Sequence, residues 1–425
     1  MKIIQENYKL KNLDKIKTYF FYNKKKNSVV WGLSRKVKML IEKKEFKVDY
    51  IIDKDIKLIG TLYKSIPIIS FEDFLLLEDA ILVILGNHVE YILADINKYR
   101  IRGEVYIVKE DLPSLFQITK EYLKNNYTIE EKKKLFKELV SMIEIEPHSY
   151  CNRTCWFCPN SFIDRRSVIK YMDLEILEQL LKDLASINYD KKIAFTRYSE
   201  PFGNEVFYDR LKLVSSYLPN AILHANTNSD FLNNETLHKA YSSGLRSLFI
   251  QIYSNENEEF DFFTIDTKAQ RIIKRISDVD IKLDFIRDDW IEYQCTYRNM
   301  SIRMYARDFK KNGVNRSGIE VTNKEVNRTS PCTVVFTDVY IDYNSRVVPC
   351  CNIRSDNKEH KAMTFGKLTS MKNSIFEIYF SDTAIKWRNS LYNFNLKKKE
   401  PCISCGFSIV NKTNSAVQYV SSIID

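Results

Sequence analysis

The sequence is poor in the residues that break or loosen a chain. Among 425 residues there are only 10 glycines and 9 prolines, and no linker or low-complexity stretch is visible. This composition excludes collagen-like and disordered chains, because both need a much larger share of Gly, Pro or polar residues. A hydrophobic fraction of 44% beside 28% charged residues is typical of a globular protein. The length then predicts two or three folded domains.

Long hydrophobic runs are also missing. The longest is AILVIL at residues 80–85, which has the length of a strand, whereas a membrane-spanning helix needs about 20 apolar residues. The first residues, MKIIQENYKLKNLDK, contain no apolar signal core. We therefore expect a cytoplasmic protein with no membrane partner. In that compartment, nine cysteines favour metal ligands over disulfides.

The net charge of +10 comes from lysines that are spread through the whole chain. In a nucleic-acid groove, aromatic residues stand between the basic ones. Short runs such as YNKKKN and NLKKKEP do not have this interleaving. We expect solvated lysine faces and no nucleic-acid partner, although a basic surface is compatible with an anionic substrate.

Residues 1–125 have the pattern of a small α/β domain. Strand-like segments such as KVDYIIDKD, AILVILGNH and EVYIVKED alternate with helical patterns, which predicts a parallel, Rossmann-like sheet. Gly32 ends the first strand and Asp53 the second, with the spacing of a dinucleotide-binding unit. The turn WGLSRK lacks the second and third glycines of such a unit. The domain is therefore either a nucleotide site or a scaffold without one.

A second alternation begins near residue 141. Six candidate strands follow, with helical patterns between the first five: SMIEIE, KIAFT, AILHAN, SLFIQI, IKLDFI and MSIRMYA. The clearest helix is MDLEILEQLLKDL, in which Asp173 is the expected N-cap. One face of this helix carries Leu174, Leu177, Leu181 and Leu184. We expect a partial (β/α)6 TIM-like barrel over residues 126–318, with its chemistry at the C-terminal ends of the strands.

The pattern changes again over residues 319–425. A short hairpin, VYIDYNSRVVP, is followed by the helical stretch SIFEIYFSDTAIKWRNSL and then by PCISC. This segment predicts a small C-terminal cysteine-rich domain.

Three cysteines lie together in the loop after the first barrel strand. The stretch HSYCNRTCWFCPN holds Cys151, Cys155 and Cys158 with the spacing Cys-x₃-Cys-x₂-Cys and supplies no fourth thiol nearby. A closed zinc site takes four protein ligands. Three thiolates instead suit a four-iron cluster that keeps one iron open. The alternative is a zinc knuckle with His148 as the fourth ligand.

The loop resembles the signature of the radical S-adenosylmethionine (radical SAM) enzymes, Cys-x₃-Cys-x-aromatic-Cys, with Phe157 as the aromatic residue. The resemblance implies a 4Fe-4S cluster bound by these three cysteines, with S-adenosylmethionine on the open iron. In this family, reductive cleavage of that cofactor gives a 5′-deoxyadenosyl radical that abstracts a substrate hydrogen.

Two further motifs extend the resemblance to cofactor-binding residues. A Gly-Glu-Pro-type motif that meets the methionyl amine follows the second strand in the family, and a Thr-Asn-Gly motif often follows the third. Here the two motifs read Ser199-Glu200-Pro201 and Thr227-Asn228-Ser229. Serine at position 199 keeps the backbone contact only if its φ stays negative.

The C-terminal cysteines suggest a second metal centre. Four of them, Cys332, Cys350, Cys402 and Cys405, complete a closed set for zinc or for an iron–sulfur cluster. The hairpin before Pro-Cys-Cys, the FGKL run and the final Cys-x₂-Cys resemble the SPASM/twitch extension of radical SAM enzymes. The run NRSG at Asn315–Gly318 also resembles the junction before it. The resemblance implies one auxiliary 4Fe-4S cluster. Cys351 competes with Cys350 as a ligand, and we favour Cys350.

The resemblance implies an enzyme that oxidises, epimerises or dehydrates a sugar, a sugar nucleotide or another small polar molecule. It implies an external electron donor such as flavodoxin or ferredoxin. The alternatives are a SPASM-type maturase that modifies a peptide and a non-enzymatic zinc-binding protein. Cys295 is a candidate hydrogen donor, against its role as a buried thiol. His224 is either a substrate ligand or a core histidine.

Overall fold

The computed structural model describes residues 8–11, 13–22, 26–33, 35–44, 47–85, 92, 99, 101, 103–108, 118–313, 327–369, 373–392 and 398–407. The chain divides into two compact units, and the first of them contains the residues up to Thr119. The domain bounds given above stay predictions. The expected boundary between residues 318 and 319, and the NRSG run, lie outside the described residues.

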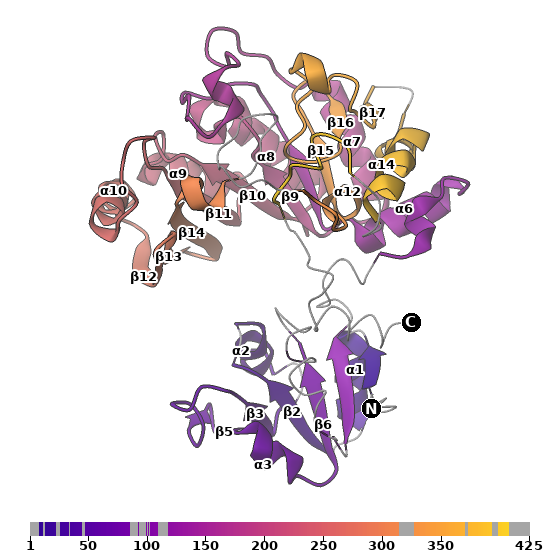
Figure 1. Cartoon of the computed structure of the whole chain (residues 1–425), viewed down its shortest axis with the longest axis vertical. Coiled ribbons are helices and arrows are strands. Elements are labelled where there is room, and N and C mark those ends of the chain that lie inside the picture. Colours follow the sequence, from indigo (N-terminus) through magenta and orange to yellow (C-terminus); the bar gives the residue numbers. More distant parts are fainter. Residues whose placement is uncertain are drawn as a thin grey trace. The chain divides into compact units, whose positions relative to one another are not determined.

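The first unit is an α/β sheet (Figure 1). Its strands and helices are β1 Tyr8–Lys11, α1 Leu13–Tyr22, β2 Asn27–Trp31, α2 Arg35–Glu42, β3 Tyr50–Ile52, β4 Leu62–Tyr63, β5 Ile66–Ile69, α3 Phe71–Leu75, β6 Ala80–Ile84 and β7 Glu104–Val108. The strand order is β1-β7-β6-β2-β3-β5-β4, and every pair except β4–β5 is parallel. When β2 is counted as the first strand, the five strands β5-β3-β2-β6-β7 follow the strand order of a Rossmann-like fold.

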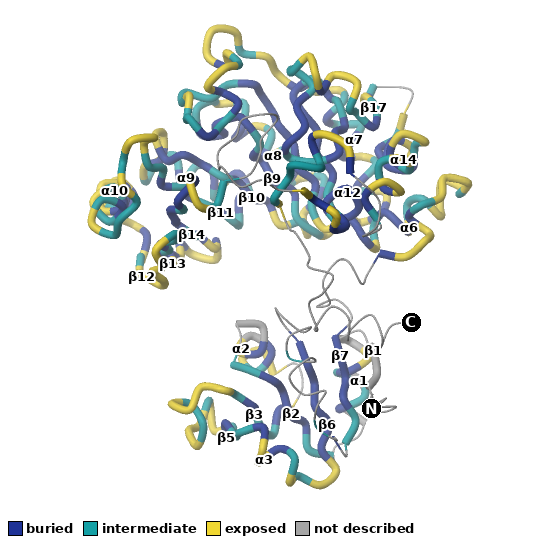
Figure 2. The backbone as a smooth tube through the Cα atoms, viewed as in Figure 1, coloured by how far each residue is buried: buried dark blue, intermediate teal, exposed yellow. Residues whose placement is uncertain are grey.

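Hydrophobic residues cover both faces of this sheet. Along β6, Leu82 and Ile84 belong to one core cluster, whereas Ile81 and Val83 belong to the other. A strand that is buried on both faces reads as an unbroken apolar run, which explains AILVIL. Figure 2 shows β2 and β6 as buried segments.

The second unit joins the barrel segment to the cysteine-rich segment. Its barrel part contains η2 Lys120–Leu123, α6 Ile129–Leu139, β8 Met142–Ile145, η3 Pro159–Ser161, α7 Leu174–Ser186, β9 Lys192–Phe195, η4 Pro201–Gly203, α8 Val206–Tyr217, β10 Ile222–Thr227, α9 Asn234–Ser242, β11 Ser247–Ile252, α10 Phe262–Arg275, β12 Asp280–Arg287, β13 Trp290–Tyr297, β14 Met300–Arg307 and α11 Phe309–Asn312. Its C-terminal part contains α12 Val334–Thr337, β15 Asp338–Ile341, β16 Arg346–Val348, η5 Lys358–His360, β17 Gly366–Lys367, α13 Ile375–Tyr379 and α14 Asp382–Tyr392.

One sheet of ten strands runs through this unit, in the order β12-β13-β14-β11-β10-β9-β8-β15-β16-β17. The row from β14 to β15 is parallel, which confirms the α/β class with a parallel sheet. The candidate strand IKLDFI forms β12 at the sheet edge, antiparallel to β13. The sequence patterns did not indicate β13, which lies between β12 and β14. The C-terminal strand β15 pairs with β8, so both segments share the sheet.

Local sequence explains how the helices beside this sheet begin and pack. The Asp173 carboxylate accepts from the backbone N–H groups of Glu175 and Ile176 at 2.8 and 3.3 Å, so it is the N-cap of α7. Leu177, Leu181 and Leu184 are buried as expected, whereas Leu174 in the first turn is exposed. Helix α13 packs on α6 through an edge-to-face contact of Phe376 with Phe136.

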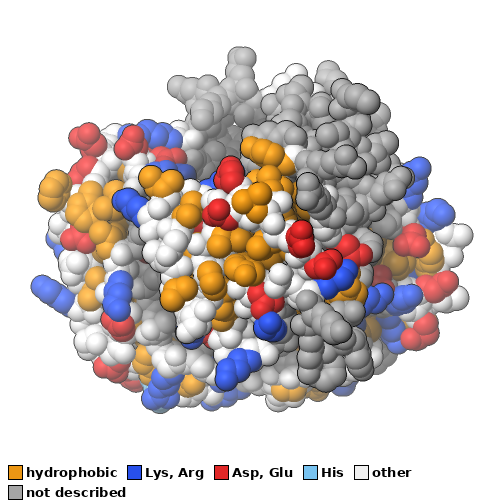
Figure 3. All heavy atoms as spheres, turned by 90° about the horizontal axis from the view of Figure 1, so that it is seen from below, with side chains coloured by type: hydrophobic (Ala, Val, Ile, Leu, Met, Phe, Trp, Pro, Cys, Tyr) orange, Lys and Arg blue, Asp and Glu red, His pale blue; other side chains and the backbone are white. Residues whose placement is uncertain are grey.

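Hydrophobic side chains gather among charged ones on the face of the molecule in Figure 3. In the first unit, the exposed large hydrophobic residues include Ile56, Leu62 and Leu76. Among the described residues, no helix combines the length and the hydropathy that a membrane span requires.

Candidate active site

The three loop cysteines line one cavity of about 290 Å³. This cavity opens where β8, β9 and β10 end, which is where barrel chemistry lies. Its lining residues include Cys151, Cys155, Cys158, Phe157, Ser199, Glu200, Thr227 and Asn228. The structure therefore brings together all but one of the cofactor-binding residues expected at this end. The remaining one, Pro201, is buried and begins η4.

Hydrogen bonds hold the cysteine loop against the end of β10. The Asp230 carboxylate accepts from Arg153 Nε at 2.7 Å and from Asn152 Nδ2 at 2.7 Å. The Asn228 side chain donates to Asn152 Oδ1 at 2.8 Å. Phe157 is buried and stacks on Phe309 with 3.5 Å between the ring centroids. The loop is thus fixed on its polar and on its apolar side.

Glu200 connects the two cofactor motifs. Its Oε1 accepts from the Thr227 hydroxyl at 2.6 Å, and its Oε2 accepts from the backbone N–H of Asn228 at 2.7 Å. Burial raises the pKa of Glu200 to about 7, although these hydrogen bonds favour the carboxylate. The residues with positive φ in the described part of the chain include Ser229, at +69°, but not Ser199. The condition for the backbone contact of Ser199 is therefore met, and Ser229 takes the left-handed conformation that its motif usually gives to glycine.

The donor set fits an iron–sulfur cluster. Burial raises the pKa of Cys151 to about 11, and burial together with the charge of Cys158 raises that of Cys155 to about 12. Three neighbouring, half-buried thiolates are stable together only beside a positive centre, which a cluster with its iron would supply. Within the described part of the chain, no three His, Cys, Asp or Glu side chains converge closely enough for a single metal ion. A four-iron cluster is wider than one ion, so its ligands need not meet at a point.

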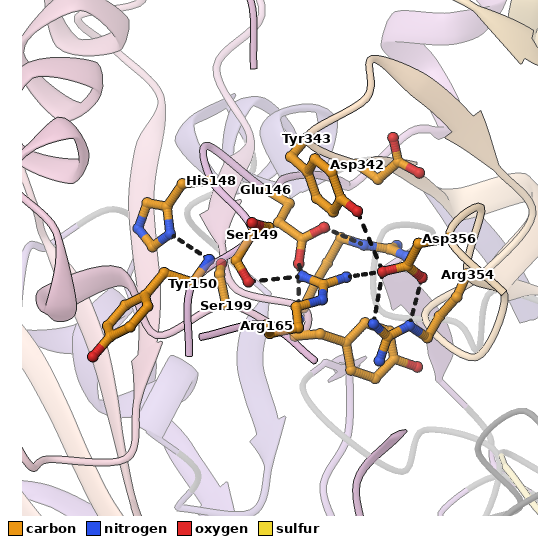
Figure 4. Close-up of polar contacts among 12 residues, drawn as sticks. Glu146, His148, Ser149, Tyr150, Arg165, Ser199, Asp342, Tyr343, Arg354 and Asp356 are labelled. Atoms are coloured by element: carbon orange, nitrogen blue, oxygen red, sulfur yellow. Dashed lines mark hydrogen bonds and ion pairs between the residues drawn. The ribbon is translucent and has the colours of Figure 1, made fainter. Parts of the chain in front are cut away.

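His148, the fourth ligand of the zinc alternative, lies apart from this set. It is fully buried, and its Nδ1 accepts from the backbone N–H of Tyr150 at 3.2 Å (Figure 4). Burial lowers its pKa to about 4, so the ring is neutral. The cavity lining contains the three cysteines without His148. His224 likewise bonds Ser247 and Asn226 at 2.9 Å each, as a core histidine does.

The C-terminal cysteines form a second group. Burial raises the pKa of Cys350 well above its usual value, and the charges of Cys351, Cys402 and Cys332 raise it further. Burial also raises the pKa of Cys402, and the charges of Cys332 and Cys405 raise it further. The four expected auxiliary ligands are therefore neighbours. Cys351 instead lines the cavity of the barrel cysteines, so these adjacent residues face different sites.

A buried charge cluster joins the cysteine-rich segment to the barrel. Arg165 donates to Glu146 Oε1 at 2.5 Å and to Asp356 Oδ2 at 2.9 Å, and Arg354 makes two bonds of 2.8 Å to the same Asp356 carboxylate (Figure 4). We call Arg165, Arg354 and Asp356 the Asp356 clamp. Next to it, the Tyr198 hydroxyl donates to the backbone carbonyl of Cys351 at 2.7 Å. The clamp fixes the segment that contributes Cys351 to the cavity.

One candidate residue from the sequence lies elsewhere, and some lining residues carry no motif. Cys295 is buried on β13, opposite Ile302 of β14, and is not among the cavity-lining residues. Its role as hydrogen donor stays a prediction. Glu144 and Arg197 do line the cavity. Only their positions, in and directly after strands of the barrel, could have indicated them.

In the first unit, the Asp53 carboxylate is already engaged by the backbone. It accepts from the N–H groups of Leu33 at 3.1 Å and Asp55 at 3.0 Å. Gly32 before it has a φ of +76°. These bonds give the Gly32–Asp53 pair a structural role in the turn, and both alternatives for this domain, a nucleotide site and a scaffold without one, stay predictions.

Comparisons with known proteins agree with this arrangement. Residues 332–406 match the SPASM family, an iron-sulfur cluster-binding domain. The S-adenosyl-L-methionine-dependent 2-deoxy-scyllo-inosamine dehydrogenase of Niallia circulans is 32% identical over 123 residues, which are 29% of this chain and 49% of that protein. The chain thus matches about half the length of this curated relative.

Two solved structures align with larger parts of the chain. BtrN in complex with AdoMet and 2-DOIA is 22% identical and covers 60% of this chain and 87% of its own, with a TM-score of 0.42. SuiB of Streptococcus suis, bound to S-adenosylmethionine, is 12% identical and covers 65% of this chain and 72% of its own, with a TM-score of 0.31.

Proposed function

We propose that this chain oxidises a hydroxyl group of a sugar-like small molecule. The proposal builds on the confirmed resemblance of the chain to the radical SAM enzymes with a SPASM domain. The expected cofactors, S-adenosylmethionine and 4Fe-4S clusters including an auxiliary one, agree with the same matches. The cluster and S-adenosylmethionine would supply the radical. The chain's own residues bind the cofactor, hold the substrate and move its proton.

A single observation carries the proposal. One cavity is lined both by the three barrel cysteines and by Cys351, whose neighbour Cys350 belongs to the auxiliary group. A substrate in this cavity lies beside the radical source and within one residue of an auxiliary ligand, which suits the removal of an electron. The dehydrogenase name of the Niallia circulans relative supports oxidation over epimerisation or dehydration.

Binding of S-adenosylmethionine is assigned to the two cofactor motifs. Glu200 is held by Thr227 and Asn228 at the edge of the cavity, which supports contact with the methionyl amine. Phe157 shields the cluster side. An external donor such as flavodoxin or ferredoxin would dock beside the cysteine loop, where Arg271 and Arg275 line a second cavity together with Cys155.

The first experiment counts iron. Protein that is reconstituted anaerobically should bind about eight irons as two four-iron clusters, and replacing Cys151, Cys155 and Cys158 by Ala should remove about half of them. Zinc alone, without charge-transfer absorbance, would end the proposal.

The second experiment tests the reaction. Reduced enzyme with S-adenosylmethionine should release 5′-deoxyadenosine when 2-deoxy-scyllo-inosamine or a member of a sugar-nucleotide panel is added, together with one ketone for each deoxyadenosine. In deuterated water, a product with an intact hydroxyl and one new deuterium would instead indicate epimerisation. Peptide substrates serve as the comparison for the maturase alternative.

A further inference from the structure

Two oppositely charged side chains from neighbouring strands border the cavity. Glu144 lies on β8, and Arg197 follows the end of β9. These strands pair in parallel with Glu144 opposite Ala194, so both side chains reach the same end of the sheet. Both line the cavity with the three barrel cysteines. Neither belongs to a motif of the cluster or of S-adenosylmethionine.

Both side chains are deeply buried, yet each keeps polar atoms that have no hydrogen-bond partner. Glu144 is 7% exposed, and the Arg197 side chain is 1% exposed. The Glu144 carboxylate accepts from the Thr196 hydroxyl through Oε2, whereas its Oε1 has no partner. Arg197 donates to the backbone carbonyl of Ile353 at 2.9 Å through Nη2, whereas its Nε and Nη1 have none.

Arg197 makes only long ion pairs with the carboxylates around it. Its Nη1 lies 3.9 Å from Glu144 Oε1 and its Nε lies 3.9 Å from Glu146 Oε2, and both distances exceed the length of a hydrogen bond. A buried polar group without a partner is destabilising, and charged groups are more so. The fold nevertheless holds Arg197 here, with a φ of +71° and its Nη2 fixed on Ile353. Such an arrangement becomes favourable when a ligand provides the missing partner.

The chemistry of the two groups selects the ligand. A carboxylate oxygen only accepts hydrogen bonds and a guanidinium only donates them. A hydroxyl group does both, so a single hydroxyl donates to Glu144 and accepts from Arg197. An ammonium group would bond only Glu144 and be repelled by Arg197, and a phosphate group would bond only Arg197 and be repelled by Glu144. A neutral group that donates and accepts at one oxygen, such as an alcohol, satisfies both members of the pair.

We propose that Glu144 Oε1 and Arg197 Nη1 bind the substrate hydroxyl group that is oxidised, and that Glu144 accepts its proton. This inference rests on the oxidation proposed above and names the residues that carry it out. Thr196 is a positioning residue, because it fixes the other carboxylate oxygen.

The reaction balances as the loss of two hydrogens from H–C–OH. The C–H bond breaks and its hydrogen atom leaves with the 5′-deoxyadenosyl radical as 5′-deoxyadenosine. The O–H bond breaks and its proton passes to the Glu144 carboxylate, while the C=O bond forms. The single remaining electron would pass to an oxidised iron–sulfur cluster, which the cysteines of the segment that matches the SPASM family would hold.

The surroundings of Glu144 suit a proton acceptor. Burial raises its pKa to about 7, although the charge of Arg197 and the Thr196 hydroxyl favour the carboxylate. Two carboxylates face it as well, Glu146 from the loop after β8 and Asp338 from β15, and both raise its pKa further. The base form is present above this pKa. Product formation should therefore rise with pH and level off above about 7.

The test compares full-length reconstituted enzyme with its Glu144→Gln and Arg197→Lys variants. Iron content and S-adenosylmethionine affinity should be unchanged in both. In Glu144→Gln, ketone formation should fall by about 100-fold, the ketone yield per 5′-deoxyadenosine should drop, and the rise with pH should disappear. In Arg197→Lys, affinity for the turned-over substrate, measured by calorimetry without reductant, should weaken by about tenfold.

Asp209→Asn is the matched control. Asp209 is an exposed carboxylate on α8 and is not among the cavity-lining residues, so this variant should keep the rate and substrate affinity of the wild type. A Glu144→Gln enzyme with the wild-type ketone rate and pH profile would overturn the subsite alone. Wild-type protein that releases no 5′-deoxyadenosine with any probe would overturn the proposed function and the subsite with it.

Discussion

Asp356→Ala should strongly destabilise the second unit, because it leaves the buried Arg354 without its anion and removes one of the two carboxylates that Arg165 contacts. Arg165 is 4% exposed and Arg354 is 1% exposed, and together they make three charge-assisted bonds to this carboxylate, of 2.8, 2.8 and 2.9 Å. After the change Arg165 retains Glu146, whereas the Arg354 guanidinium retains a neutral acceptor, Asn160 Oδ1 at 3.2 Å. Removing one partner of a buried ion pair costs about 3–5 kcal/mol.

That loss can be measured by thermal unfolding. In a domain of this size, 1 kcal/mol shifts the Tm by about 2–4 °C, so Asp356→Ala should lower the Tm of the second unit by about 6–20 °C. Asp356→Asn keeps the shape and part of the hydrogen bonding, and it should lose less. The control is Asp209→Ala on the exposed face of α8, which should change stability by at most about 0.5 kcal/mol.

A Tm for Asp356→Ala that is indistinguishable from the wild type would refute the reasoning, since it would mean that the Asp356 clamp contributes about as little as a surface ion pair. The clamp should also matter for the site. Because it fixes the segment that bears Cys351, Asp356→Asn should raise the KM for substrate more than it lowers S-adenosylmethionine affinity.

Three further changes test individual residues. Glu200→Gln should weaken S-adenosylmethionine binding at unchanged iron content, because a charge-assisted hydrogen bond is about twice as strong as a neutral one; unchanged affinity by equilibrium dialysis would return Glu200 to a structural role. Cys350→Ser should remove the auxiliary iron and Cys351→Ser should keep it, which iron analysis and absorbance would show, and equal losses would contradict the opposite facing of the two thiols. Thr196→Val removes a hydrogen bond that lowers the pKa of Glu144, so the pH at which product formation levels off should move upward, and an unmoved profile would speak against Glu144 as the titrating group.

Much of the site could be predicted from sequence because its chemistry depends on fixed spacing. A loop of eight residues from Cys151 to Cys158 brings its thiols together regardless of what surrounds it. Glu200 follows β9 and Thr227 ends β10, so the parallel pairing of these two strands, which the alternating pattern already indicated, brings the two residues together. The strand at 280–287 was indicated by its composition, but its place at the sheet edge depends on pairing with β13.

The rest depends on long-range packing. Nothing in a strand pattern distinguishes Glu144, which borders the cavity, from Glu146, which bonds Arg165. The separate facing of Cys350 and Cys351 follows from contacts such as that of Tyr198 with the Cys351 carbonyl, 153 residues away in sequence. β13 was missed although WIEYQCTY alternates buried and more exposed residues, which is the pattern of a strand with one buried face.

The pairing of β15 with β8 has a consequence for protein engineering. Because residues Asp338–Ile341 hydrogen-bond along Met142–Ile145, the cysteine-rich segment continues the barrel sheet and is not a detachable module. A chimera that exchanges this segment with one from another protein must therefore bring a matching first strand, or else expose the edge of β8 to solvent and to neighbouring chains. Strands β8 and β15 would therefore have to be exchanged together, although they lie far apart in the sequence.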